Sequence, residues 1–329
     1  MMDNEKIIQR PPKIYLDTRD IINIAEVRKG NKPQPASSEE DYRNIDKFIK
    51  SCGCLIFNPY AALEWVEGRA TIESARWIAA VVDSAKVKYE LEADYIVYTR
   101  EILDQCHQQG QDIRIPDFPI LQKLSDNESI SSVLGILATK VPDYLEEDKL
   151  ERFKQDGKIP IDIPVVSVRE WVEETLNWKE KNPKTYQGRV DDFKSSLLED
   201  INRKDEYFND RQQYRKDWIK RLLKVDKILK AFNPGVDVDG ILEKIDMKNC
   251  PAVSLYWEVR EKRMKSGKPP EDNDVDDYAF LPVIPYADLI LMEKGLRGYI
   301  LWADSSLESK VFSDTGDFLN ALKNQGFTW

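Results

Sequence analysis

Near its start the chain carries a short apolar segment that stops on an acid. Residues 13–18 read Lys-Ile-Tyr-Leu-Asp-Thr, a strand-like pattern that ends at Asp17, and a helical pattern begins at about Asp20. Strand, then acid, then helix is a common arrangement in α/β proteins. It places the carboxylate at the C-terminal edge of a parallel sheet, where such folds bind ligands. The sequence therefore predicts an α/β fold with Asp17 at a ligand-binding edge.

Strand and helix patterns alternate over the rest of the two terminal regions. Strands are predicted at 54–57, 288–292 and 311–314. Residues 296–302 fit either a helix or a strand. Helices are predicted at 39–51, 60–68, 72–86, 95–108, 250–265 and 317–324, with a short helix at the acidic run 271–277.

The middle of the chain, residues 109–249, differs from the terminal regions in its sequence pattern. Prolines break its first half into short pieces, and its second half, 167–232, is long, charged and helical. It has an apolar stripe but no repeat of fixed period and no sustained heptads. The sequence therefore predicts a discontinuous core made of 13–108 and 250–329, with a helical insertion subdomain at 109–249.

The amino-acid composition limits which kinds of catalytic and metal-binding site the chain can form. The formal net charge of -10, from 59 acidic and 49 basic residues, gives no global support to nucleic-acid binding, which would need local patches or metal ions. With a single histidine, His107, histidine-based catalysis and a multi-histidine zinc site are excluded. The four cysteines lack zinc-knuckle spacing and read as reduced thiols of a cytosolic protein. The expected metal ligands are therefore oxygens, which favour Mg²⁺ or Mn²⁺.

No membrane segment is expected. The sequence has no run of eighteen apolar residues, and its first residues lack a hydrophobic signal region. The predicted location is therefore cytoplasmic, with no membrane partner.

Carboxylates stand beside several of the predicted strands. Five of the seven residues from 271 to 277 are acidic, which is typical of a solvated helix start but also of a cation site. If the strands align in parallel, acids from distant parts of the chain meet in one pocket. Two divalent ions about 4 Å apart in such a pocket activate water for phosphodiester cleavage. The candidate ligands are Asp17, Glu64, Asp274, Asp277, Asp288 and Glu293.

The order of these acids resembles that of the PIN-domain nucleases. In that family an Asp ends the first strand, and a Glu or Asp lies early in a following helix. A third Asp begins a helix before the fourth strand, and a fourth acid follows that strand. The residues that carry the resemblance are Ile-Tyr-Leu-Asp17-Thr, Glu64 after an Asn-Pro turn, Asn-Asp-Val-Asp-Asp277 and Ala-Asp-Leu-Ile-Leu-Met-Glu293. Residues 311–329 resemble the closing strand and helix of the family.

The resemblance implies a three-layer α/β/α sandwich with a central parallel sheet, interrupted here by the helical insertion. It implies a Mg²⁺- or Mn²⁺-dependent endoribonuclease that cleaves RNA, or less often DNA, by metal-activated water. The catalytic positions would be Asp17, Glu64, Asp277 and Glu293.

Two of these positions have rivals in the sequence. Asp274 competes with Asp277 for the third position, and the spacing to Glu293 favours Asp277. The family's fourth position usually reads Thr-x-Asp, whereas this chain has Met-Glu293, with Asp288 as the rival. Asp274 and Asp288 therefore stay in the set of expected metal ligands.

Basic residues for a substrate groove lie near the acids. Arg19 follows Asp17 by two residues, and Lys294 follows Glu293. Arg263 belongs to a basic run at 260–268, which either steers a phosphate backbone or is a solvated helix face. Arg19, Arg263 and Lys294 are the expected substrate-binding residues.

Two other functions are open. One is a catalytically decayed PIN-like scaffold whose helical insertion binds a protein partner. The other is a phosphatase-like hydrolase with Asp17 as covalent nucleophile. Such enzymes usually need a second Asp two residues further on, where this chain has Arg19, so this reading is disfavoured.

Overall fold

The computed structural model describes residues 10–58, 72–91, 94–111, 113, 120–124, 168–170, 172–173, 177, 183–225, 233, 235–271 and 274–329. These residues form an α/β fold on a six-stranded sheet with the order β4-β3-β2-β1-β5-β6. Five strands are parallel, and β4 pairs antiparallel to β3. The strands are β1 (Lys13–Leu16), β2 (Cys54–Phe57), β3 (Val87–Leu91), β4 (Leu121–Leu124), β5 (Leu289–Leu291) and β6 (Val311–Phe312).

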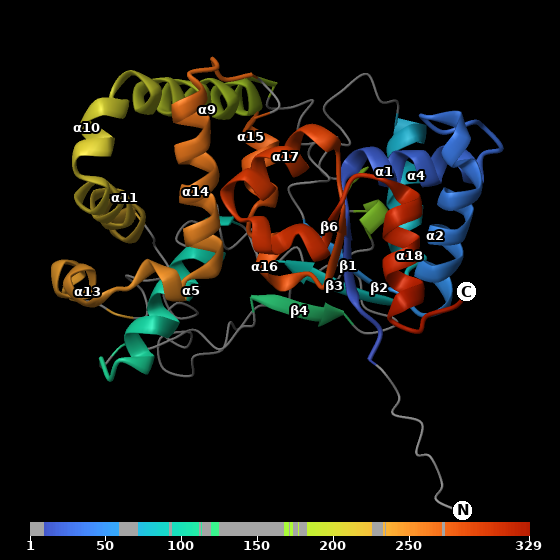
Figure 1. Cartoon of the computed structure of the whole chain (residues 1–329), viewed down its shortest axis with the longest axis horizontal. Helices are drawn as coiled ribbons and strands as arrows, with labels where there is room; N and C mark the ends of the chain where they lie inside the picture. The colour runs from blue at the N-terminus through green and yellow to red at the C-terminus, as the bar shows by residue number, and fades with distance from the viewer. Residues whose placement is uncertain are drawn as a thin grey trace, which may run out of the picture.

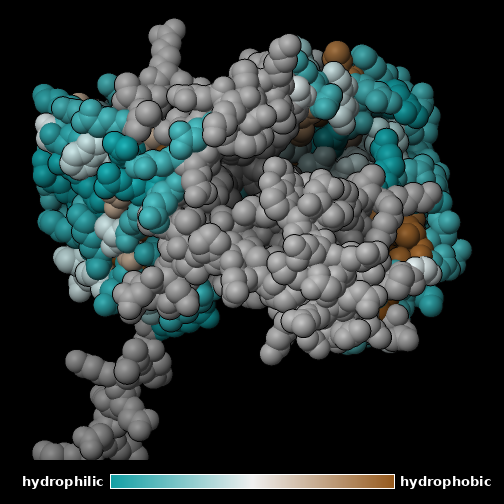
Figure 2. All heavy atoms as spheres, turned by 180° about the vertical axis from the view of Figure 1, so that it is seen from behind, coloured by the Kyte–Doolittle hydropathy of each residue, from teal (hydrophilic) through white to brown (hydrophobic). Residues whose placement is uncertain are grey.

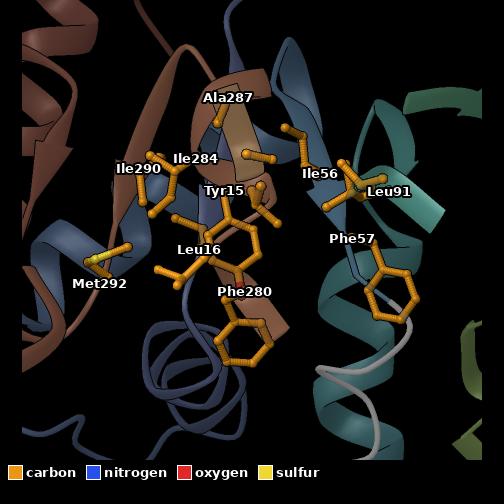
Figure 3. Close-up of a cluster of buried hydrophobic side chains, with 14 of the residues drawn as sticks. Tyr15, Leu16, Ile56, Phe57, Leu91, Phe280, Ile284, Ala287, Ile290 and Met292 are labelled. Atoms are coloured by element: carbon orange, nitrogen blue, oxygen red, sulfur yellow. The ribbon is translucent and has the colours of Figure 1, made fainter. Parts of the chain in front are cut away.

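The central strands are buried on both faces. All residues of β2 and β5 are buried, as expected for parallel strands covered by helices on two sides. Side chains of β1, β2 and β5 meet those of two short helices, α15 (Asp274–Phe280) and α16 (Val283–Tyr286), in one apolar cluster (Figure 3). The rings of Tyr15 and Phe280 lie 5.9 Å apart between centroids. In this core, residues near the C-terminal end of the chain therefore pack directly against β1, the first strand.

Helices flank the sheet on both sides (Figure 1). The chain steps from β1 to β3 in one direction and from β5 to β6 in the other, so right-handed crossovers put helices on opposite faces. One group, which packs together, is α1 (Thr18–Arg28), α2 (Glu39–Ser51), α4 (Ile72–Asp83) and α18 (Thr315–Asn324). The other is α5 (Asp94–Gln108), α14 (Pro251–Ser266), α16 and α17 (Lys294–Ala303).

Helix α14 crosses the molecule beside the sheet and is buried almost all round. Pro251 occupies its first turn and Gly267 ends it in a left-handed conformation with φ 64°. Its N-terminal N–H groups are capped by another helix: the buried carboxylate of Glu101, in α5, accepts from Ala252 and Val253 at 2.9–3.1 Å. Burial raises the pKa of Glu101.

The helical segment packs against α14 through buried charges. It comprises α9 (Pro183–Asn202), α10 (Lys204–Asn209), α11 (Arg211–Val225) and α13 (Val238–Lys244). Arg260 of α14 pairs with Asp200 of α9, and both side chains are buried. Glu261 of α14 accepts from Arg215 and Tyr207. The helical segment and the sheet thus share one continuous core.

Most of the elements predicted within the described residues are confirmed, with two differences, and one open alternative is decided. The helix predicted at 60–68 lies outside the described residues. Strand β3 was not predicted, although Val-Lys-Tyr-Glu-Leu alternates apolar and charged residues in the manner of a strand. Strand β4 lies inside the predicted insertion yet extends the sheet, because its backbone completes the open edge of β3. Residues 296–302, which fitted either element, are helical in α17.

The described surface is mainly hydrophilic on the face seen in Figure 2, with small and separate hydrophobic areas. Large hydrophobic side chains that are exposed, among the residues described, are Ile22, Trp77, Leu198 and Trp302. Within the same residues, no helix is both long and apolar enough to cross a lipid bilayer. The four cysteines carry free thiols, and His107 is exposed in the last turn of α5.

Candidate functional site at the C-terminal edge of the sheet

The strand order reverses between β1 and β5, and the candidate site lies where these two strands end. The chain winds away from β1 through β2 and β3, returns beside it as β5 and continues to β6. In open α/β sheets, helices on either side of such a reversal leave a crevice beyond the carboxyl ends of the strands. Asp17 directly follows β1 and lies opposite Met292, one residue beyond the register pair Leu16 and Leu291.

Asp17 is fixed in this position by backbone contacts from both strands. Its N–H donates to Leu291 at 2.9 Å, and it is the N-cap of α1. Oδ1 accepts from the N–H of Thr18 at 2.8 Å, and Oδ2 accepts from the N–H of Glu293 at 3.2 Å. The residue is 8% exposed. Burial, with repulsion from Asp20, raises the pKa of Asp17 to about 6.

Asp20 is a neighbouring acid that the sequence reasoning did not select. It is fully buried in the first turn of α1 and accepts hydrogen bonds from Arg19 at 3.0 Å and from the hydroxyl of Tyr42 at 2.7 Å. Burial raises the pKa of Asp20. The spacing of three residues from Asp17 was the available signal, because residues three apart lie near each other on a helix.

Glu293 and Lys294 are brought to the same edge of the sheet. Glu293 is the N-cap residue of α17 and follows β5, so its backbone reaches Asp17 while its side chain is exposed. Lys294 begins α17 and is also exposed. Both predicted residues are therefore exposed to solvent at this edge of the sheet.

Asp277 lies on α15, which is held to this edge from the other side. Asn58 follows β2 and is 1% exposed; extending the register of β1 and β2 places it beside Asp17. Its amide donates to the carbonyl of Ala279 at 3.1 Å, two residues after Asp277. Asp277 itself is half-buried. Asn58 thus connects the helix that carries Asp277 to the strand next to Asp17.

Asp274 and Arg263 are paired with each other. Their side chains are 11% and 7% exposed, and Nη2 of Arg263 donates to Oδ2 of Asp274 at 2.6 Å. The same carboxylate accepts from the N–H of Glu271, and the same guanidinium bonds the hydroxyl of Tyr299 at 3.0 Å. The expected metal ligand and the expected phosphate contact are therefore paired with each other and buried away from solvent, and we leave both out of the candidate site.

Asp288 lies at the opposite edge of the sheet. It precedes β5, and its carboxylate accepts from the N–H of Lys13, the first residue of β1, at 2.7 Å. Asp17 is four residues further along the same strand, which at 3.3 Å per residue is roughly 13 Å away. The structure does not bring these two acids together. It therefore favours Glu293 over Asp288 as the acid that accompanies Asp17.

Glu64 lies outside the described residues, so its predicted place in the site is not examined by the structure. Within the part of the chain that is described, no group of three or more His, Cys, Asp or Glu side chains is close enough to hold a metal ion. The donor chemistry at the edge nevertheless fits a hard cation. Each carboxylate oxygen of Asp17 accepts a hydrogen bond from one backbone N–H and has capacity to accept more. Glu293 is exposed beside it.

Fold and edge together define an α/β protein with a buried acid at the point where the strand order reverses. No protein-family model matches this sequence, and neither a curated protein nor a solved structure matches it.

Proposed function

We propose that this protein is a divalent-metal-dependent nuclease, in the first place an endoribonuclease, with its site at the C-terminal edge between β1 and β5. One observation carries the proposal: Asp17 is buried at the topological switch point, with a raised pKa and with Glu293 adjacent. A buried carboxylate whose ionised form is disfavoured gains from a nearby cation. Perturbed acids in such places are candidates for functional roles.

The order of elements supports the resemblance to PIN-domain nucleases. Asp277 lies on a helix that precedes β5, the fourth of the parallel strands along the chain, and Glu293 follows that strand. Asp17 ends the first strand. These are three of the four acid positions that the resemblance implies, and Glu64 would supply the fourth.

In the proposed site, Asp17, Glu64, Asp277 and Glu293 would hold Mg²⁺ or Mn²⁺. When bound, these ions lower the pKa of a water molecule and stabilise the leaving oxygen of a phosphodiester. The backbone N–H groups of Thr18 and Glu293 orient the Asp17 carboxylate, and Asn58 holds the helix of Asp277 at the same edge. Glu293 and Lys294 stand at the open side, where a substrate would enter.

Cleavage of labelled single-stranded RNA in Mn²⁺ tests the proposal. Wild-type protein is expected to cleave, EDTA to abolish cleavage, and Asp17→Asn and Asp277→Asn to reduce the rate about 100-fold or more, as for loss of other strong electrostatic groups in active sites. Asp288→Asn, at the opposite edge, is the matched control and is expected to cleave like wild type. Equal cleavage by wild type, Asp17→Asn and Asp277→Asn would overturn the assignment.

The decayed scaffold is the second candidate, because two of the expected metal ligands are engaged elsewhere: Asp274 pairs with Arg263, and Asp288 accepts from the backbone of Lys13. Its helical segment would then bind a protein partner. Absence of both RNA cleavage and Mn²⁺ binding in the wild-type protein favours this candidate over the nuclease.

A further inference from the structure

Arg19 is held at the C-terminal edge of the sheet by two separate partners. Its Nε and Nη2 atoms donate to the carboxylate of Asp20 at 3.0–3.2 Å, and Nη2 also donates to the carbonyl of Met292 at 3.3 Å. Met292 lies between β5 and Glu293, so Arg19 links the first turn of α1, which follows β1, to the end of β5 where the strand order reverses. Asp17 interacts electrostatically with the same guanidinium.

A chain of buried hydrogen bonds continues from the Asp20 carboxylate into the protein. The hydroxyl of Tyr42 donates to Oδ1 of Asp20 at 2.7 Å, and Nδ2 of Asn23 donates to the hydroxyl of Tyr42 at 3.0 Å. Asn23 also exchanges hydrogen bonds with the backbone of Gln34 at 2.9 and 3.0 Å. Asp20, Tyr42 and Asn23 are each less than 5% exposed, whereas the side chain of Arg19 is 40% exposed.

Stability alone does not account for Asp20. A buried carboxylate has a large desolvation penalty, and apolar side chains often stabilise the same position as well as an ion pair. Anchoring of the loop at Gln34 does not require it either, because Asn23 makes both of those bonds itself. What Asp20 adds is a fixed orientation for the exposed guanidinium of Arg19 at the edge of the sheet.

The guanidinium keeps donors for a ligand. Nη1 takes part in none of the hydrogen bonds found among the described residues, and Nε and Nη2 are already oriented by Asp20 and Met292. An arginine side chain that is already ordered loses little conformational entropy when it binds a ligand. The N–H groups of its planar guanidinium also match the spacing of phosphate oxygens. Asp17 and Asp20 repel an anion at this edge, so a phosphate would bind here through a directed contact with the guanidinium.

We propose that Arg19 is the phosphate-binding residue of this site, and that Asp20 and Tyr42 are positioning residues that orient it. The ligand class is the phosphodiester group of a single-stranded nucleic acid. This inference rests on the proposed nuclease function for the identity of the ligand, but binding can be measured without cleavage.

The experiment measures the affinity of a short fluorescent single-stranded RNA, and of the DNA of the same sequence, by anisotropy in EDTA at several salt concentrations. Arg19→Gln is expected to bind about tenfold more weakly, the effect of one charge-assisted hydrogen bond, and its salt dependence to fall by about 0.7 in the log–log slope. Arg19→Lys should recover part of the salt dependence. Tyr42→Phe, which keeps the buried ring, should weaken binding about threefold, a fraction of one hydrogen bond.

Arg203→Gln is the matched control, because Arg203 is an exposed arginine paired with Glu199 and Glu206 in the helical segment. Circular dichroism checks that each variant is folded. Wild-type affinity and salt slope in Arg19→Gln, or no binding by wild type, would overturn the phosphate role. Wild-type affinity in folded Tyr42→Phe would overturn the positioning role.

The two proposals fail separately. Arg19-dependent binding without any Mn²⁺-dependent cleavage by wild type removes the nuclease and keeps the phosphate site. Cleavage that depends on Asp17, with binding unaffected by Arg19→Gln, removes the phosphate site and keeps the nuclease.

Discussion

The backbone N–H of Glu293 donates to the carboxylate of Asp17 at 3.2 Å, although the two residues are 276 positions apart in the sequence. The contact exists because β1 and β5 are neighbours in the sheet and end together. It orients a buried acid at the place where an open parallel sheet binds its ligands.

The ionisation of Asp17 should make stability depend on pH. Its pKa is raised to about 6 in the folded protein from an ordinary value of 3.8, so the folded state binds this proton more tightly. Its contribution to stability is therefore present below pH 3.8 and is lost as the pH rises through about 6. The shift in the pKa of Asp17 corresponds to a change of about 3 kcal/mol in the free energy of unfolding.

Urea unfolding of wild type and Asp17→Asn across this pH range measures the effect. The variant should gain stability relative to wild type as the pH rises, because its amide does not ionise. Asp314→Asn makes the same change at the N-cap of α18 and controls for replacing a capping carboxylate with a neutral amide. A difference between wild type and Asp17→Asn that stays constant with pH would contradict the raised pKa.

Mn²⁺ should stabilise the folded protein through the edge acids. A ligand at 100 times its dissociation constant stabilises the native state by about 2.7 kcal/mol, so the melting temperature should rise at neutral pH. The rise should be lost in Asp17→Asn. It should persist in Asp288→Asn, since Asp288 bonds the backbone of Lys13 at the other edge. An equal rise in wild type and Asp17→Asn would place the ion elsewhere.

Removal of the Asn58 amide should loosen α15. Asn58→Leu has a similar volume but cannot donate to Ala279, which leaves a buried carbonyl unsatisfied at a cost of about 1–3 kcal/mol. Amide hydrogen exchange at 274–280 should accelerate, and Mn²⁺ affinity should fall because Asp277 is less well placed. Unchanged exchange in this helix would show that the apolar cluster around Phe280 holds it without Asn58.

The buried pair between Arg260 and Asp200 should matter more than an exposed one. Arg260→Met leaves Asp200 buried and unpaired, so the free energy of unfolding should fall by about 3–5 kcal/mol. The double variant with Asp200→Leu should recover much of that loss. Arg203→Gln, at an exposed pair of the same helical segment, should change stability by less than about 1 kcal/mol. Similar losses in both single variants would contradict this account.

Local sequence signals determined many of the elements of the core. Cys54–Phe57 is a short apolar run next to a turn, and Glu39–Ser51 carries its apolar side chains at helical spacing, so both were predicted with their observed bounds. The position of Asp17 at a strand end was equally local. The sequence missed β4 because a short edge strand with two polar residues acquires its structure from pairing with β3.

Tertiary structure decided which acids belong together. Asp288 and Glu293 flank the same strand and look equivalent in sequence, yet strand direction puts only Glu293 beside Asp17. Asp274 and Arg263 looked like a ligand and a substrate contact until packing paired them. The chain by itself determined the strand, the acid that ends it and the helix that follows, because these depend on neighbouring residues. Partners of a charge depend on what packs against it, and residues hundreds of positions away supply that packing.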